Sequence, residues 1–136
     1  MSNQLKINII KELSKTQKLS KSISINKARI NSNEVKKNDV FFAIKGKVND
    51  GNNFVSQSFK KKASLAIVNK IQNNLDVNRQ IKVKNTLKFL TNVSKVYRKN
   101  ISTNIIAITG SCGKTTLKEL LGSVMGKISY TSISPK

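Results

Sequence analysis

The spacing of apolar residues along the chain predicts helices and strands in alternation. Steps of three and four residues predict helices over residues 5–13, 54–62, 86–99 and 114–125. Short apolar or β-branched runs predict strands over residues 22–25, 39–44, 64–68, 81–83, 104–109 and 128–132. Helices that separate strands in this order imply crossover connections, and we therefore expect an α/β fold with a parallel or mixed sheet.

A change of pattern near residues 82–85 divides the chain into two parts. We expect residues 1–83 to form a small α/β domain with a mixed sheet. Residues 84–136 would supply the first strand, loop and helix of a parallel-sheet domain. One such unit cannot cover both faces of a parallel sheet, so we expect this part to be marginally stable alone. We therefore interpret the chain as a fragment or as the product of a shortened gene.

A glycine-bearing turn before the helix expected at 114–125 carries the most specific chemistry. It reads Thr109-Gly110-Ser111-Cys112-Gly113-Lys114-Thr115-Thr116. Small residues let backbone N–H groups approach phosphate oxygens, and the start of a helix adds its positive end. Lys114 offers a charge to the outer phosphates, and Thr115 offers a hydroxyl to Mg²⁺. We expect a nucleotide, with ATP as the first choice, to bind Gly110, Ser111, Cys112, Gly113, Lys114, Thr115 and Thr116.

The usual phosphate-loop pattern has a glycine five residues before Gly113, where this chain has Ile108. The shorter form Gly-x-x-Gly-Lys-Thr-Thr remains. The alternative interpretation is a structural turn with a solvated lysine. The apolar run before the turn and the helical pattern after it favour phosphate binding.

The net charge of +20 raises nucleic-acid binding as an alternative function. Of the 26 basic residues only Arg29, Arg79 and Arg98 are arginine, and the lysines are spread along the whole chain. This pattern favours weak attraction to anions over specific recognition of nucleic acid. The chain has one cysteine, no apolar run long enough to span a membrane and no signal-peptide pattern, so we expect a cytoplasmic protein.

Two motifs resemble those of the Mur ligases, which build the peptide of bacterial cell-wall precursors. The ATP loop of that family is similar to Thr109-Gly110-Ser111-Cys112-Gly113-Lys114-Thr115-Thr116-Leu117-Lys118-Glu119. Its uridine-nucleotide-binding domain is similar to Asn31-Ser32-Asn33-Glu34-Val35-Lys36-Lys37-Asn38-Asp39-Val40-Phe41-Phe42-Ala43-Ile44-Lys45-Gly46, followed by Asp50-Gly51-Asn52-Asn53-Phe54-Val55. Within the family, Gly110-Ser111 before the variable Cys112 and Lys118-Glu119 after the threonines are most similar to the branch that adds D-alanyl-D-alanine.

The resemblance implies an ATP-dependent ligase of peptidoglycan precursor synthesis. It would join D-alanyl-D-alanine to UDP-N-acetylmuramoyl-tripeptide through an acyl phosphate. Lys114 would be the catalytic residue, ATP and Mg²⁺ the cofactors, and Thr115 the metal-binding residue. The residues expected to contact the UDP substrate are Ser32, Lys45, Gly46, Asp50 and Gly51. We expect a monomer with no specific nucleic-acid or membrane partner, and no ligase activity from this chain alone.

Several positions depart from the pattern of the family. Asn33 stands where an arginine is common, which weakens the expected UDP-phosphate contact there. Asn38 stands where glycine is usual, and asparagine tolerates the same left-handed backbone. Asn52 replaces a common histidine. Gly46 and Gly51 can equally serve to shape a loop, and Asp50 can serve to cap a helix.

Two other functions stay open. The first is a different ATP-dependent amide ligase with the same loop, either another Mur ligase or an enzyme of the folylpolyglutamate synthase type. The second is a basic module that binds nucleic acid. Phe41 and Phe42 are expected to be core residues on opposite faces of a strand, because neighbouring residues of a strand point to opposite sides.

Overall fold

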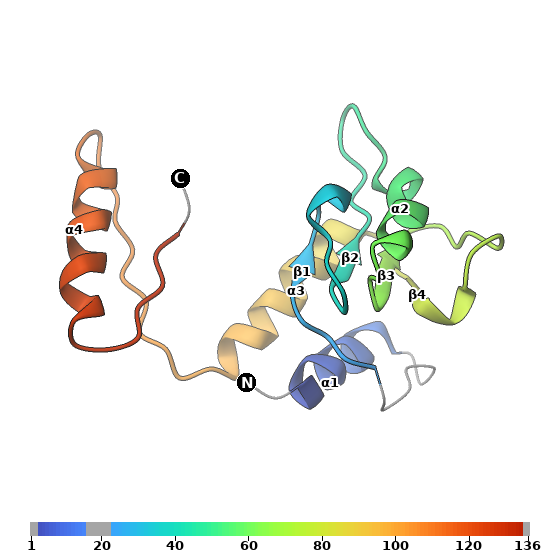
Figure 1. The fold of residues 1–136 in the computed structure, drawn as a ribbon, viewed down its shortest axis with the longest axis horizontal. Coiled ribbons are helices and arrows are strands. Elements are labelled where there is room, and N and C mark those ends of the chain that lie inside the picture. The colour runs from blue at the N-terminus through green and yellow to red at the C-terminus, as the bar shows by residue number, and fades with distance from the viewer. Residues whose placement is uncertain (1–2, 16–22, 135–136) are drawn as a thin grey trace. The chain divides into compact units, whose positions relative to one another are not determined.

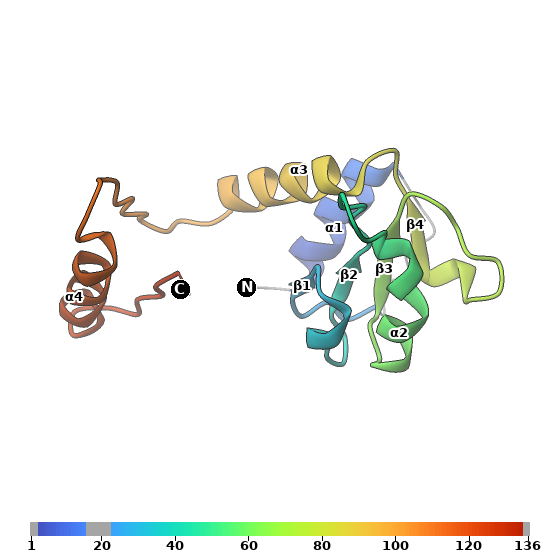
Figure 2. The same ribbon diagram turned by 90° about the horizontal axis from the view of Figure 1, so that it is seen from above.

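A computed structural model of the chain describes residues 3–15 and 23–134 (Figures 1 and 2). The chain forms two compact units that divide between Ile101 and Ser102.

A four-stranded sheet forms the centre of the first unit. Its order is β1-β2-β3-β4, with bounds Ala28–Arg29, Val40–Phe42, Leu65–Val68 and Gln80–Lys82. All three strand pairs are parallel, with Val40 opposite Leu65 and Ile67 opposite Ile81. The α/β class is therefore confirmed, and the sheet is parallel where we expected a mixed one. The reason is that each strand returns to the same end of the sheet through a helical crossover.

Helices cover both faces of this sheet. Helices α1 (Asn3–Ser14) and α3 (Thr86–Lys99) lie on one face, and α2 (Val55–Lys60) lies on the other (Figure 2). Short 3₁₀ helices η1 (Ser32–Glu34), η2 (Gly51–Phe54) and η3 (Val77–Arg79) complete the connections. The helix expected over 54–62 thus begins as a 3₁₀ turn and becomes α-helical at Val55.

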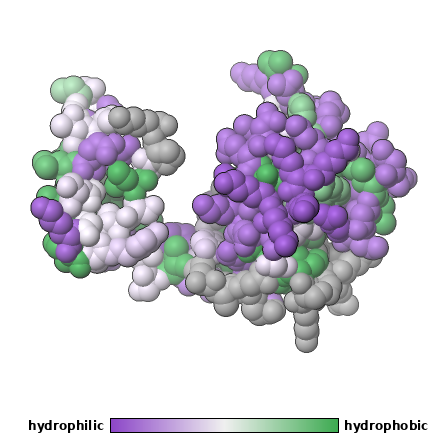
Figure 3. Space-filling model, viewed as in Figure 1, coloured by the Kyte–Doolittle hydropathy of each residue, from purple (hydrophilic) through white to green (hydrophobic). Residues whose placement is uncertain are grey.

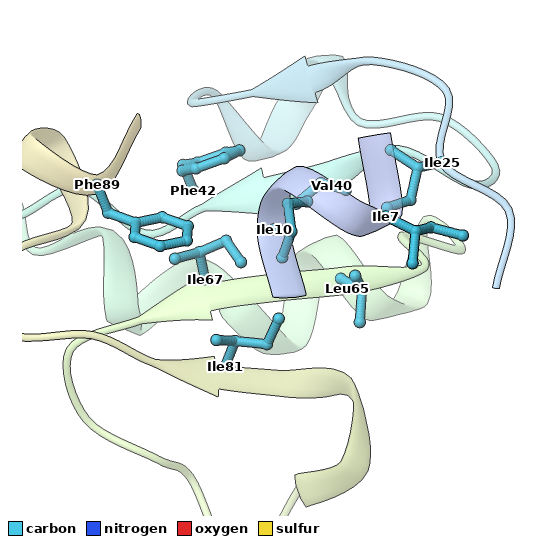
Figure 4. Packing of buried hydrophobic residues seen from close by; sticks show 9 residues of the cluster. All are labelled: Ile7, Ile10, Ile25, Val40, Phe42, Leu65, Ile67, Ile81 and Phe89. Atoms are coloured by element: carbon cyan, nitrogen blue, oxygen red, sulfur yellow. The ribbon is translucent and has the colours of Figure 1, made fainter. Parts of the chain in front are cut away.

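The larger core lies between α1, α3 and the sheet (Figure 4). Phe42 belongs to this core and packs near Phe89 of α3, whereas Phe41 belongs to the core under α2. The expectation that the two phenylalanines face opposite sides is confirmed. Fully burying a side chain of this size stabilises the fold by about 1.5–3 kcal/mol, so both faces of the sheet contribute to the stability of the unit.

Helix α3 belongs to the first unit. Asn85 caps it by accepting a hydrogen bond from the Lys88 backbone N–H at 2.8 Å. Thr86 then donates its hydroxyl hydrogen bond to the Ala43 carbonyl at 3.0 Å, which ties the helix to the end of β2. The division that we expected near residues 82–85 therefore lies instead after α3, because packing on α1 and the sheet holds this helix in the first unit.

Three expected strands are absent from the described residues, and these predictions are wrong. Ser22 lies outside the described residues, and residues 23–25 form no strand; pairing starts instead at Ala28. Residues 104–109 and 128–132 also form no strand. A strand requires a neighbour to satisfy its backbone, and the second unit offers none in its described part. Consequently Ile105 and Ile106 are 65% and 60% exposed.

The second unit contains helix α4 (Lys114–Gly126), as expected. No described residue between 102 and 134 is buried. Hydrophobic side chains such as Leu120 and Val124 are exposed, and hydrophobic groups are visible on the surface of this unit in Figure 3. The first unit shows a mostly hydrophilic face in the same view.

Candidate functional site

The glycine-bearing turn before α4 adopts a compact, partly left-handed backbone. Gly110 has φ +152° and Gly113 has φ +74°, a region that side chains with a Cβ rarely adopt. Gly113 is the N-cap residue of α4, and its carbonyl accepts the Leu117 backbone N–H at 2.9 Å. The chain therefore turns at Gly113 and enters the helix at Lys114, as the phosphate-loop interpretation requires.

Lys114 folds back over this turn. Its Nζ donates to the Gly110 carbonyl at 2.6 Å and lies 3.4 Å from the Ser111 carbonyl. The first N–H groups of a helix have no partner within the helix, so the start of α4 offers donors to an anion. Residues 110–117 are exposed. The backbone N–H groups at the start of α4 and the Lys114 ammonium group are donors of the kind that phosphate oxygens accept.

The same loop has hydroxyl groups suited to a phosphate-bound magnesium ion. Thr115 and Thr116 are exposed in the first turn of α4. The described residues contain no group of three or more His, Cys, Asp or Glu side chains that could hold a metal ion. A magnesium ion at this loop would therefore depend on phosphate oxygens together with the hydroxyl group of Thr115.

A lysine-lined pocket of about 540 Å³ lies at the carboxyl ends of the strands in the first unit. Lys45 follows β2, Asn69 follows β3 and Lys84 follows β4. The other lining residues are Ile44, Gly46, Lys47, Asn85 and the first two residues of α3. Ligands of parallel α/β sheets bind at this edge of the sheet. The three lysines and the start of α3 make the lysine pocket suitable for an anion.

Gly51 and Asp50 shape the loop behind the lysine pocket. A Cβ atom on Gly51 would lie 2.6 Å from the backbone nitrogen and oxygen of Ile44, so only glycine allows this approach. Asp50 pairs with Lys45 in an isolated antiparallel bridge and caps η2 by accepting the Asn52 backbone N–H at 2.9 Å. The Asn52 side-chain amide donates to the same carboxylate, which lowers the pKa of Asp50. The capping role that we considered for Asp50 is confirmed.

No protein-family model matches the chain. The UDP-N-acetylmuramoyl-tripeptide–D-alanyl-D-alanine ligase of Rickettsia prowazekii is 37% identical over 103 residues, which are 76% of this chain and 23% of the relative. The structure of UDP-N-acetylmuramoylalanyl-D-glutamyl-2,6-diaminopimelate–D-alanyl-D-alanyl ligase from Acinetobacter baumannii superposes with a TM-score of 0.74 and 28% identity, covering 89% of this chain and 28% of that one. This chain belongs to the Mur ligase family.

Other Mur ligases resemble the chain to a similar degree. The UDP-N-acetylmuramoyl-L-alanyl-D-glutamate–2,6-diaminopimelate ligase of Rickettsia montanensis is 36% identical over 72% of this chain and 21% of its own length. MurF ligase from Thermotoga maritima, solved in complex with ADP, has a TM-score of 0.62 and 32% identity over 75% of this chain and 23% of that chain. This Mur ligase chain therefore spans about a quarter of the length of the relatives it matches. No helix in its described residues is long and apolar enough to cross a membrane.

Ser32 of this Mur ligase chain lies apart from the lysine pocket. It is buried, and its hydroxyl donates to Gln57 Oε1 at 2.8 Å. Gln57 Nε2 in turn donates to Asn33 Oδ1 at 3.0 Å, and Lys61 Nζ donates to the Asn33 carbonyl at 2.6 Å. Asn33 is thus hydrogen-bonded to Gln57 and Lys61, which belong to the segment of α2. Of the five expected substrate residues, Lys45 and Gly46 line the pocket, Asp50 and Gly51 support it, and Ser32 does neither.

Sequence reasoning missed several residues of the lysine pocket. Lys47, Asn69 and Lys84 line it beside the expected Lys45. The available signal was the position of Asn69 and Lys84 directly after two strands, since the carboxyl ends of parallel strands meet at one edge. Neither residue has a distinctive motif, so only the order of the strands places them together.

Proposed function

We propose that this chain supplies the nucleotide-binding parts of an ATP-dependent ligase that adds D-alanyl-D-alanine to UDP-N-acetylmuramoyl-tripeptide. The observation that carries the proposal is the left-handed turn at Gly113, which leads directly into α4, together with the Lys114 ammonium group that lies over this turn. The similarity to the Rickettsia prowazekii ligase supports the choice of substrates.

The loop would bind the outer phosphates of ATP. ATP supplies the phosphoryl group that activates the substrate carboxylate. Lys114 would leave the Gly110 carbonyl and place its ammonium group on the phosphate oxygens, where charge grows during transfer. The backbone N–H groups at the start of α4 would orient those oxygens, and Thr115 would hold Mg²⁺ through its hydroxyl.

The lysine pocket of the first unit would bind the UDP part of the other substrate. Lys45, Lys47 and Lys84 would neutralise the diphosphate, and the start of α3 adds its positive end. Gly51 would act indirectly, because it lets the loop that carries Lys45 fold closely against Ile44.

Titrations followed by ¹H–¹⁵N NMR test the two nucleotide sites separately. We expect Mg²⁺–ADP to shift the amides of Gly113 and Lys114, and UDP to shift those of Gly46 and Lys84. Lys114→Ala should weaken Mg²⁺–ADP binding about tenfold, the loss expected for one charge-assisted contact, whereas Lys127→Ala serves as a control of equal charge in the same unit. Unchanged loop amides at saturating Mg²⁺–ADP would contradict the proposal. Salt-sensitive DNA binding that ignores Lys114→Ala would favour a nucleic-acid-binding module.

A second candidate is a ligase that adds diaminopimelate, since the Rickettsia montanensis enzyme of that name is almost as similar. The two substrates differ in the peptide that the UDP-sugar carries. Competition between UDP-N-acetylmuramoyl-tripeptide and UDP-N-acetylmuramoyl-L-alanyl-D-glutamate for the lysine pocket distinguishes the candidates. Tighter binding of the tripeptide substrate supports the first, and tighter binding of the dipeptide substrate supports the second.

A further inference from the structure

An apolar groove of about 620 Å³ lies in the first unit, between α1, α3 and the β1–β2 edge of the sheet. Its floor is formed by buried residues, including Ile10, Val40 and Phe42. Half-buried residues of α3, namely Leu90, Val93 and Tyr97, form one wall. The groove shares no residue with the lysine pocket or the phosphate loop.

The charged residues of this apolar groove are all basic. Lys6 from α1, Lys27 before β1 and Arg98 from α3 line it, and no Asp or Glu occurs among its lining residues. An apolar surface lined by a few cationic side chains suits a ligand that has an apolar group and a negative charge. The composition of the groove therefore indicates an amphiphilic anion.

Lys6 is positioned by the protein. Its Nζ donates to the Asn26 carbonyl at 2.7 Å and to the Ile25 carbonyl at 3.1 Å. An ammonium group has three donors, so these two hydrogen bonds leave one for a ligand. Because two carbonyls already hold the ammonium group in place, binding of an anion to it costs less conformational entropy of the Lys6 side chain.

The size and charge of the apolar groove select among possible occupants. A second copy of this chain would bring another net charge of +20, which opposes close association. A volume of about 620 Å³ lies within the usual range of roughly 300–1,000 Å³ for small-molecule sites. We propose that the groove binds a single-chain amphiphilic carboxylate, with its alkyl chain along Val93 and Phe42 and its carboxylate on Lys6.

Calorimetric titration of the full chain with three probes tests this proposal below their micelle-forming concentrations. Dodecanoate carries the chain and the anion, acetate carries the anion alone, and dodecyltrimethylammonium carries the chain with a cation. We expect saturable binding of dodecanoate with one site, and at least about tenfold weaker binding of both other probes. We expect this order of affinities because only dodecanoate can contact the apolar residues and pair with the Lys6 ammonium group at the same time.

Paired substitutions locate the bound dodecanoate. Lys6→Ala should weaken its binding about five- to tenfold, whereas Lys88→Ala, which removes an exposed lysine outside the groove, should leave it unchanged. Val93→Ser should weaken binding by a similar factor, and Val96→Ser on the same helix should not. The far-ultraviolet circular dichroism spectrum of each variant must match that of the parent chain.

Three results would overturn the proposal. Equal losses in Lys6→Ala and Lys88→Ala would show attraction to net charge alone. Binding to phosphatidylglycerol vesicles without binding to monomeric dodecanoate would show a membrane surface. Binding of an acidic amphipathic peptide in the groove, with no effect of dodecanoate on it, would show a protein partner.

Discussion

Arg29 donates a hydrogen bond from its Nε to Asp39 Oδ2 at 3.0 Å, which joins β1 to the residue before β2. The same carboxylate accepts the backbone N–H groups of Lys27 and Lys36, each at 3.1 Å. Asp39 is 2% exposed. Burial raises the pKa of Asp39, but the hydrogen bonds from Arg29, Lys36 and Lys27 outweigh it and hold the pKa below its ordinary value.

Removal of this carboxylate should destabilise the first unit. We expect Asp39→Ala to lower the free energy of unfolding by about 2–4 kcal/mol, because it leaves the Nε of Arg29 and two backbone N–H groups without their acceptor. Urea unfolding followed by circular dichroism measures the change. Glu34→Ala removes the exposed partner of the same arginine and should cost less than about 1 kcal/mol. Equal losses in the two variants would contradict a special role for Asp39.

Stability should also depend on pH through Asp39 and Asp50, the two carboxyl groups whose pKa is lowered in the folded protein. Asp50 has a lowered pKa, chiefly because of the Asn52 side-chain hydrogen bond. A carboxyl group with a lowered folded-state pKa contributes stability that is fully present above its unfolded value of about 3.9. That contribution is lost as the pH falls through the folded-state pKa. We therefore expect stability to drop below about pH 4, and Asp39→Asn to make this drop shallower in urea titrations.

Gly51 should not tolerate even alanine. The added Cβ would meet the Ile44 backbone at 2.6 Å, and backbone atoms cannot move aside cheaply. We expect Gly51→Ala to destabilise the first unit by at least about 2 kcal/mol, as overpacking does. Gly46→Ala in the same loop would meet only the Asn49 carbonyl at 3.2 Å and should cost much less. Thermal unfolding of both variants measures the difference, and similar midpoints would refute the steric argument.

Nucleotide binding should require glycine at position 113, because of the left-handed backbone there. Its φ of +74° costs a residue with a Cβ about 1–2 kcal/mol. Under the proposed function, Gly113→Ala should therefore weaken Mg²⁺–ADP binding about tenfold. Gly126→Ala, at the end of the same helix, meets no atom within 4 Å and should leave binding unchanged. Normal Mg²⁺–ADP affinity in Gly113→Ala would show that the left-handed turn is unnecessary.

The two units should differ in local stability. Helix α4 has no buried residue, whereas β3 is buried along its whole length. Amide groups of α4 should therefore exchange with solvent at least about 100-fold faster than those of β3, since local opening of an unpacked helix costs little. Hydrogen exchange followed by NMR measures both sets in one sample. Equal protection of α4 and β3 would contradict the expected instability of the second unit.

Local features of the fold could be predicted from sequence because neighbouring residues encode them. Apolar spacing predicted the helices at 5–13, 86–99 and 114–125, and the structure has helices at all three places. Asn38 takes the left-handed backbone expected for it, with φ +66°. Residues 104–109 have the composition of a strand and form none, because a strand depends on a neighbour that periodicity does not reveal.

The sequence by itself determined the family of this protein and the glycine-bearing turn that leads into α4, since the small residues from Gly110 to Gly113 act through adjacent backbone groups. Only the tertiary structure decided which distant residues meet. It placed Lys84 and Lys45 in one pocket at the edge of the sheet, and it joined Ser32 to Gln57 through a hydrogen bond. It also formed the apolar groove between α1 and α3. Contacts of this kind depend on strand order and helix packing, which are set by burial across the whole unit.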